Sequence, residues 1–262
     1  FLILAIVAGV GYLFHINKEA DDNVKAYQNI ANVYVKDKKE EAKKEDIKVS
    51  GQNVEKKETP KDVDFIDRHL LRVIDFNGLI AQNDDTDSWL YLPDTSFDFP
   101  VVMEPVVGQY YYDLIGFDGM WNGAGTPLIP AQNTGEEDVR TLILAHRMVS
   151  YWGEEDYLFS HLPERWGSQA AAEKNKYVYT YKPDGTSYRW RVWAGLPSKG
   201  DSPIYITPYI EGSEGYQNLI NWVSANTNYE YGPKPNAYMK TLMLSTCSRN
   251  ADDVNIGRFV AV

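Results

Sequence analysis

The sequence predicts a mainly β protein, a closed or nearly closed β-barrel with a few helices around it. From Trp89 onward, short runs of apolar, aromatic and β-branched residues alternate with turn residues, as successive strands do. The 19 tyrosines and 7 tryptophans of the 262-residue chain suit pleated surfaces. Strands do not alternate regularly with long helices, so a parallel α/β sheet is not expected. The runs are WLYL, FDFPVV, RTLILAH, KYVYTYK, SYRWRVWAGL, KTLMLSTC and GRFVAV.

Two helices are expected beside these strands. The first begins at Thr59, because Thr followed by Pro60 is typical of a helix start. Its apolar stripe continues at helical spacing to about Asn83 and contains Ile66, Leu70, Val73 and Ile80. The second covers residues 213–226, where the same spacing is kept by Tyr216, Leu219, Ile220 and Val223. Between two strands, Lys182-Pro183-Asp184-Gly185 predicts a tight hairpin turn.

Composition divides the chain into three parts. Residues 1–16 begin with the uncharged run FLILAIVAGVGYLF, which we interpret as part of a transmembrane anchor, since a spanning helix needs roughly 20 apolar residues. A cleavable signal peptide is the alternative, but no small-x-small cleavage motif follows the run. Residues 17–62 mix Lys and Glu with few large apolar residues and are expected to form a charged stalk or linker. Residues 63–262 are expected to form the folded domain.

Charge is unevenly distributed along the chain. Residues 1–62 hold 11 basic and 11 acidic residues, so the net charge of −11 resides in residues 63–262. An acidic domain is a poor partner for nucleic acid, whose phosphates call for clustered Lys and Arg. Cys247 is the only cysteine of the sequence. An exported domain with one cysteine has no internal disulfide, so the thiol needs another explanation.

Three residues of reactive type lie in or directly after apolar strands. Cys247 ends the run TLMLSTC, His146 follows TLILA, and Arg258 lies inside the otherwise apolar GRFVAV. Each has a structural alternative. A lone cysteine is often a small buried hydrophobe, and a histidine at a strand end can be a packing residue. An arginine in an apolar strand can form an ion pair with a carboxylate.

Together, the three residues fit an acyl-transfer site. A thiolate such as that of Cys247 is a nucleophile, and nearby cationic groups stabilise it. A histidine such as His146 can protonate the leaving group and later deprotonate the incoming one. An arginine such as Arg258 can stabilise the negative oxygen of a tetrahedral intermediate without losing its own proton.

This combination resembles the sortases of Gram-positive bacteria, and class B sortases most closely. The resemblance rests on Leu-Ser-Thr-Cys at 244–247, an Arg eleven residues later, and a His after Leu-Ile-Leu-Ala. The segment NDDTDSWLYLPDTSFDFPVV at 83–102 and the helix at 213–226, just before the cysteine strand, are similar to the corresponding parts of class B members. The match runs from about Asp75 to Val262.

The resemblance implies an eight-stranded sortase-type β-barrel, with N-terminal helices and an inserted helix before the cysteine strand. It also implies residue roles: Cys247 as nucleophile, His146 as acid and base, and Arg258 as the group that stabilises the oxyanion or positions the substrate. Ser245 would line the groove that binds the sorting signal. No metal or organic cofactor is implied.

Two positions depart from the family pattern. Ala145 stands before the histidine where the family often has Gly, and Arg249 stands two residues after the cysteine where many class B members have Asp. Asp252 and Asp253 are close by in the sequence, but neither is assigned a catalytic role. The sequence therefore identifies no carboxylate partner for His146.

The expected function is that of a single-pass cell-membrane transpeptidase with its catalytic domain outside the cell. It would cleave a C-terminal sorting signal of the Asn-Pro-x-Thr type after Thr and transfer the surface protein to an amine on a peptidoglycan precursor. A pilin lysine is an alternative acceptor, which would make the protein a pilin-polymerising enzyme. Two further alternatives are a hydrolytic cysteine protease and a non-catalytic extracellular binding barrel with a buried Cys247.

Overall fold

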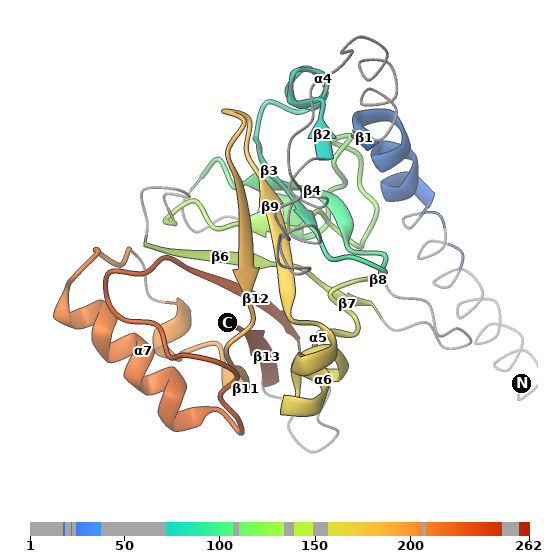
Figure 1. Cartoon of the computed structure of the whole chain (residues 1–262). Helices are drawn as coiled ribbons and strands as arrows, with labels where there is room; N and C mark the ends of the chain where they lie inside the picture. Colours follow the sequence, from blue (N-terminus) through green and yellow to red (C-terminus); the bar gives the residue numbers. More distant parts are fainter. Residues whose placement is uncertain are drawn as a thin grey trace, which may run out of the picture.

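The computed structural model describes residues 25–37, 72–106, 110–133, 139–148, 157–205, 208–247 and 257–262, together with Lys18 and Asp22. Its centre is a nine-stranded sheet that curls into a half-barrel (Figure 1). The prediction of a mainly β, barrel-type fold is confirmed. The strands are β3 (Thr86–Tyr91), β4 (Asp98–Met103), β5 (Leu128–Ile129), β6 (Arg140–Leu144), β9 (Tyr177–Tyr181), β10 (Ser187–Arg191), β11 (Gly195–Lys199), β12 (Thr241–Cys247) and β13 (Gly257–Ala261).

The chain itself connects the two edges of the curled sheet. The strand order is β10-β9-β3-β4-β5-β6-β12-β13-β11, and the two edge strands, β10 and β11, are consecutive in the sequence. Only residues 192–194 separate them, so one bent segment pairs with β9 at one edge and with β13 at the other. The sequence predicted this segment, SYRWRVWAGL, as a single strand. Its interruption turns the seven predicted runs into eight strands, and β5, which the sequence did not predict, is the ninth.

Gly195, which begins β11 directly after the bend, packs closely against main chain. A Cβ atom on Gly195 would lie 1.9 Å from the carbonyl oxygen of Trp166 and 2.7 Å from the hydroxyl oxygen of Tyr229. The Tyr229 hydroxyl donates a hydrogen bond to the same Trp166 carbonyl. In the bend, the Trp193 N–H donates to the Val262 carbonyl at 2.6 Å. Main chain packs closely against its neighbours here, so no side chain fits at position 195.

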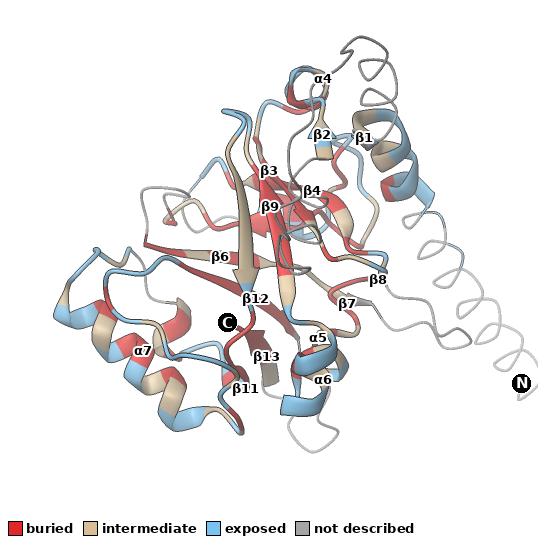
Figure 2. Cartoon of the chain, viewed as in Figure 1, coloured by how far each residue is buried: buried red, intermediate tan, exposed pale blue. Residues whose placement is uncertain are grey.

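β12 separates two apolar clusters, because side chains along a strand alternate between the faces of its sheet. Leu242 and Leu244 belong to the larger cluster inside the curl, whereas Met243 belongs to the cluster that includes α7 (Glu214–Asn226). Figure 2 shows buried residues along the central strands and a mixture of buried and exposed residues along α7. The predicted helix at 213–226 is confirmed: Ser213 caps it, and its four predicted apolar residues are buried.

Short elements complete the fold. Three are α-helices, two are 3₁₀-helices and two form a small separate hairpin. They are α4 (Phe76–Gln82), α5 (Leu162–Trp166), α6 (Gln169–Lys174), η1 (Tyr111–Asp113), η2 (Pro203–Tyr205), β7 (Arg147–Met148) and β8 (Tyr157–Leu158).

The helix predicted from Thr59 to about Asn83 is wrong in its central part. Its start lies outside the described residues, but Arg72–Ile74 forms strand β2, and helix begins only at α4. Two physical causes act together. Val73 and Ile74 are β-branched and pair with β1 (Val35–Asp37), and Asp75 caps α4 by accepting a hydrogen bond from the Gly78 N–H at 3.0 Å.

Part of the predicted stalk packs against the barrel. Residues 25–34 are helical and lead into β1. Tyr27 is buried, and its hydroxyl donates to the Gly125 carbonyl at 2.6 Å. Ile30, Ala31, Tyr34 and Val35 pack against the larger apolar cluster. The rest of the predicted stalk, residues 38–62 and all of 17–24 except Lys18 and Asp22, lies outside the described residues, as does the predicted anchor, residues 1–16. In the described part of the chain, no helix combines the length and apolar character that crossing a bilayer requires.

The close packing at Gly195 predicts that Gly195→Ala lowers the free energy of unfolding by about 1–3 kcal/mol, the usual cost of an overpacked site. A Cβ atom there meets main chain, which cannot move aside as a flexible side chain can. Urea unfolding followed by tryptophan fluorescence measures the change. Gly215→Ala is the matched control, because its Cβ would meet only the Ser213 hydroxyl, at 4.0 Å. That variant should leave stability unchanged or raise it by up to about 1 kcal/mol. Equal effects of the two substitutions on the free energy of unfolding would contradict the close packing argued for Gly195.

Candidate active site

The candidate site lies at the sheet edge where β6 and β12 both end. The two strands are parallel and adjacent, and Ser245 is the register partner of Leu144. Parallel strands have their carboxyl ends at the same edge. His146 follows Leu144 by two residues, and Cys247 follows Ser245 by two residues. The main chain therefore brings the predicted histidine and cysteine to equivalent positions on neighbouring strands.

The third predicted residue lies on the other side of the cysteine strand. β13 runs antiparallel to β12, and Arg258 is the register partner of Cys247. Partners that lie directly opposite each other in an antiparallel pair have Cα atoms roughly 4.5–5.5 Å apart. The Cys247 side chain lies outside the described part of the structure, so its position is given by its main chain alone.

A cavity of about 310 Å³ opens where these strands end. His146, Ser245 and Arg258 all line it, so three of the four predicted site residues meet at one cavity, beside the main chain of the fourth. Its volume is at the lower end of those of small-molecule pockets. Other lining residues come from η1, from η2 and from the ends of β6 and β12: Tyr110, Tyr112, Asp113, Ala145, Tyr205 and Thr246.

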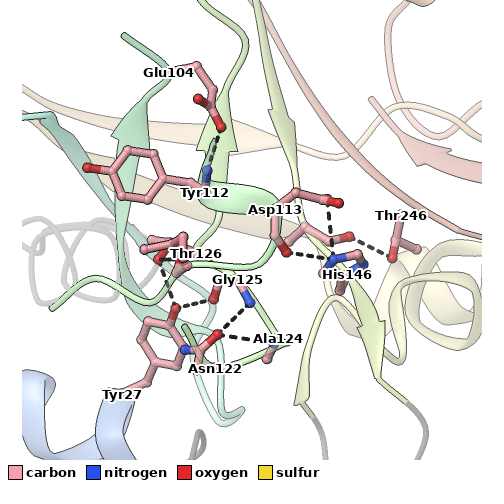
Figure 3. Close-up of polar contacts among 12 residues, drawn as sticks. Tyr27, Glu104, Tyr112, Asp113, Asn122, Ala124, Gly125, Thr126, His146 and Thr246 are labelled. Carbon is pink, nitrogen blue, oxygen red and sulfur yellow. Dashed lines mark hydrogen bonds and ion pairs between the residues drawn. The ribbon is translucent and has the colours of Figure 1, made fainter. Parts of the chain in front are cut away.

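His146 is bound to a residue that the sequence did not identify. Its Nε2 atom lies 2.8 Å from the main-chain carbonyl oxygen of Asp113 and 3.2 Å from the carboxylate oxygen Oδ1 of the same residue (Figure 3). The side chain of His146 is 28% exposed and that of Asp113 is 53% exposed. Asp113 is 33 residues away along the chain, in a short helical turn. No local sequence pattern marks such a partner.

A buried carboxylate holds the turn that carries Asp113. Glu104 is 1% exposed and accepts hydrogen bonds from the N–H groups of Tyr111 and Tyr112 at 3.0 and 2.8 Å. Burial raises the pKa of Glu104, and these two main-chain hydrogen bonds act against that rise. The Tyr112 hydroxyl donates to Asp85 at 2.8 Å. The turn is therefore fixed at both its main chain and its central side chain.

Tyr205, on η2, connects Arg258 with Ser245. Its ring centroid lies 5.1 Å from the guanidinium carbon of Arg258, within the range of a cation–π contact. Its hydroxyl is hydrogen-bonded to the Ser245 hydroxyl at 2.8 Å. Sequence reasoning placed Ser245 in the groove but missed Tyr205, because η2 is far away along the chain and has no motif.

Arg258 forms no ion pair with any carboxylate that the structure describes. Its Nε atom is buried and has no hydrogen-bond partner there. The structural ion pair considered from the sequence is thus not found among these residues. Burying a guanidinium N–H group is favourable only when it donates to an acceptor, so Arg258 is suited to donate hydrogen bonds to an oxygen that carries negative charge.

Within the same described residues, no group of three His, Cys, Asp or Glu side chains could hold a metal ion.

The solved structures that resemble this chain include several class B sortases. Sortase B of Clostridium perfringens has a TM-score of 0.61 and 21% identity, over 71% of this chain and 97% of that one. The Staphylococcus aureus sortase B–substrate complex has a TM-score of 0.61 and 20% identity, over 71% and 82%. A Streptococcus pyogenes class B sortase involved in pilus biogenesis has a TM-score of 0.58 and 20% identity, over 71% and 95%. No protein-family model and no curated protein matches the sequence.

These identities are low, so the comparison concerns the fold. The likeness covers 82–97% of each of these three structures, and it agrees with the resemblance found in the sequence around Cys247. The protein has the class B sortase fold.

Proposed function

We propose that the protein is a cysteine transpeptidase of the class B sortase type. The observation that supports this most strongly is the register at the end of β12. Cys247 is paired with Arg258 on one side, and its parallel neighbour β6 delivers His146 to the same edge. The neighbouring strands β6, β12 and β13 thereby bring the three residue types of a thiol acyltransferase to one edge of the sheet.

In the proposed reaction, the Cys247 thiolate attacks the carbonyl carbon of the Thr residue in the sorting signal. A C–S bond forms and the carbonyl electrons move to the oxygen, where Arg258 donates a hydrogen bond. The intermediate collapses and breaks the C–N bond, and His146 gives its proton to the leaving amine. A thioester remains on Cys247.

The second half of the reaction reverses these roles. An acceptor amine attacks the thioester, and His146 takes a proton from it. The C–S bond then breaks and the Cys247 thiolate is restored. Water can resolve the same thioester, so only the positioning of the acceptor favours transfer over hydrolysis.

The substrate and location are also proposals. The sorting signal would be of the Asn-Pro-x-Thr type, and the acceptor an amine of a peptidoglycan precursor. A pilin lysine is a second candidate acceptor, since one structural relative is a sortase involved in pilus biogenesis. Residues 1–16 would anchor the protein in the membrane with the catalytic domain outside, because their sequence is an uncharged apolar run.

A peptide assay tests the chemistry. The full chain is incubated with an Asn-Pro-x-Thr peptide, with and without hydroxylamine as a strong nucleophile, and the products are identified by mass spectrometry. Wild type should form an amine-dependent hydroxamate, and Cys247→Ala should form none. Arg258→Lys keeps the charge but loses the planar fork, and should lower kcat about 10²- to 10³-fold. Cleavage that is indifferent to the amine would favour the protease alternative. A Cys247→Ala variant as active as wild type would exclude both enzymes.

The ring of Tyr205 should matter more than its hydroxyl. Tyr205→Leu removes the cation–π contact with Arg258 and should lower kcat/KM by roughly tenfold. Tyr205→Phe keeps the ring and loses only the hydrogen bond to Ser245, so its kcat/KM should stay within about twofold of wild type while the unfolding free energy falls by about 0.5–1.5 kcal/mol. The reverse order of activities would show that the ring does not orient Arg258.

Protease treatment of intact cells tests the proposed topology. An external domain on a membrane anchor should be released into the medium, whereas a cytoplasmic marker protein should stay intact. A domain that survives in intact cells but is digested after lysis would contradict the external location.

A further inference from the structure

We propose that Asp113 is a positioning residue for His146. In this proposal it holds the imidazole through Nε2, so that Nδ1 is the nitrogen that exchanges protons during the reaction. The proposal rests on the transpeptidase function proposed above, and it adds a residue from outside the Cys-His-Arg set. It also supplies a carboxylate partner for His146 that the sequence did not identify.

The geometry fixes which nitrogen carries the proton. Two oxygens of Asp113 approach the same nitrogen: the main-chain carbonyl at 2.8 Å and Oδ1 at 3.2 Å. A carbonyl oxygen can only accept, so Nε2 must be the donor. In a neutral imidazole the other nitrogen then has a free lone pair. Among the described residues no polar partner of Nδ1 is found.

The contribution of the Asp113 side chain is mainly orientation. The carboxylate is half exposed, so water screens its charge. Its oxygen nevertheless gives the imidazole a second acceptor beside the main-chain carbonyl, and two acceptors on one N–H restrict rotation of the ring. A histidine that must first donate a proton and later accept one gains from such restriction, because both transfers need a fixed geometry.

The surrounding structure holds Asp113 from two sides. On one side, Glu104 accepts from the two main-chain N–H groups that precede Asp113, as described above. On the other, Gly125 packs directly on the Asp113 carbonyl: a Cβ atom on Gly125 would lie 2.3 Å from that oxygen. Gly125 has a φ of +66°, a conformation that favours glycine. Its own carbonyl accepts from Tyr27 (Figure 3).

The oxygen that binds His146 is therefore part of a tightly packed main-chain contact. Tyr27 belongs to the helical segment 25–34, so the N-terminal part of the chain supports the same contact from outside the barrel. A main-chain carbonyl held by packing on both sides is suited to positioning, since it cannot turn away when substrate enters.

The first test is spectroscopic and does not need activity. The full chain is labelled with ¹⁵N-histidine in a Cys247→Ala background, which removes the thiol from the site. His146 is assigned among the four histidines by its loss in His146→Gln. At a pH where the ring is neutral, Nε2 should carry the proton and Nδ1 should give the shift of an unprotonated nitrogen. Adding Asp113→Ala or Gly125→Ala should shift the signals toward a mixture of tautomers. A proton on Nδ1 with Asp113 intact would overturn the proposal.

The second test separates orientation from charge. Asp113→Ala should lower kcat about fivefold with KM unchanged, an effect near the size of one exposed polar pair. Asp113→Asn keeps an acceptor oxygen and should restore kcat to within about twofold of wild type. Asp118→Asn is the matched control: it removes one charge from the same loop, and no contact with His146 is found for it. An Asp113→Ala variant as active as wild type would overturn the proposal, and so would an Asp113→Asn variant as impaired as Asp113→Ala.

The outcomes distinguish this proposal from the proposed function. If wild type turns over no peptide, the transpeptidase function fails, while the tautomer measurement still decides whether Asp113 positions His146. If wild type is active and the Asp113 variants follow neither expected change, the function stands and the positioning role fails.

Discussion

The parallel pairing of β12 with β6 is the contact on which the candidate site depends. It aligns Ser245 with Leu144, and further hydrogen bonds extend the alignment beyond the end of β6. The Ala145 N–H donates to the Ser245 carbonyl at 3.2 Å, and the Thr246 hydroxyl donates to the Ala145 carbonyl at 2.9 Å. His146 is the next residue. A shift of one residue would exchange the two faces of β12 and move Ser245 away from the cavity.

Parallel pairing also explains where the rest of the site comes from. Two parallel strands cannot be joined by a tight turn, so each such pair needs a long connection. The sheet has two parallel pairs, β4 with β5 and β6 with β12. The chain between β4 and β5 contains η1 and delivers Asp113 to His146. The chain between β6 and β12, residues 145–240, includes three other strands of the sheet and also η2, which delivers Tyr205 to Arg258. The chain between the strands of each parallel pair thus supplies the side chains that contact the three predicted polar residues of the cavity, His146, Ser245 and Arg258.

The two faces of β12 pack against different parts of the protein. Leu242 and Leu244 pack inside the curled sheet, where apolar burial stabilises the strand. Met243 packs on the side of α7, and Ser245 lies beside the cavity near the end of the strand. The strand that carries Cys247 is therefore packed on both faces close to the site. This arrangement suits a nucleophile that must stay in register with Arg258 while peptides enter and leave.

The sequence by itself determined most strands of the sheet, α7 and the residue types of the site. Strands show as short apolar runs and α7 as helical spacing, because each depends on the local chain and on which side chains are buried. Reactive residues at strand ends are also visible, since Cys247 and His146 interrupt apolar patterns and Arg258 lies within one.

Only the tertiary structure decided the remaining features. Arg72–Ile74 became a strand because β1 supplied a partner, although its spacing fitted a helix. One predicted strand became β10 and β11 because its two halves pair with opposite edges of the curl. Asp113 and Tyr205 join the site through connections of many residues, and contacts of that kind leave no periodic or local mark in a sequence. The physical reason is the same in each case: local patterns record burial and turn chemistry, whereas pairing partners and loop positions depend on the whole fold.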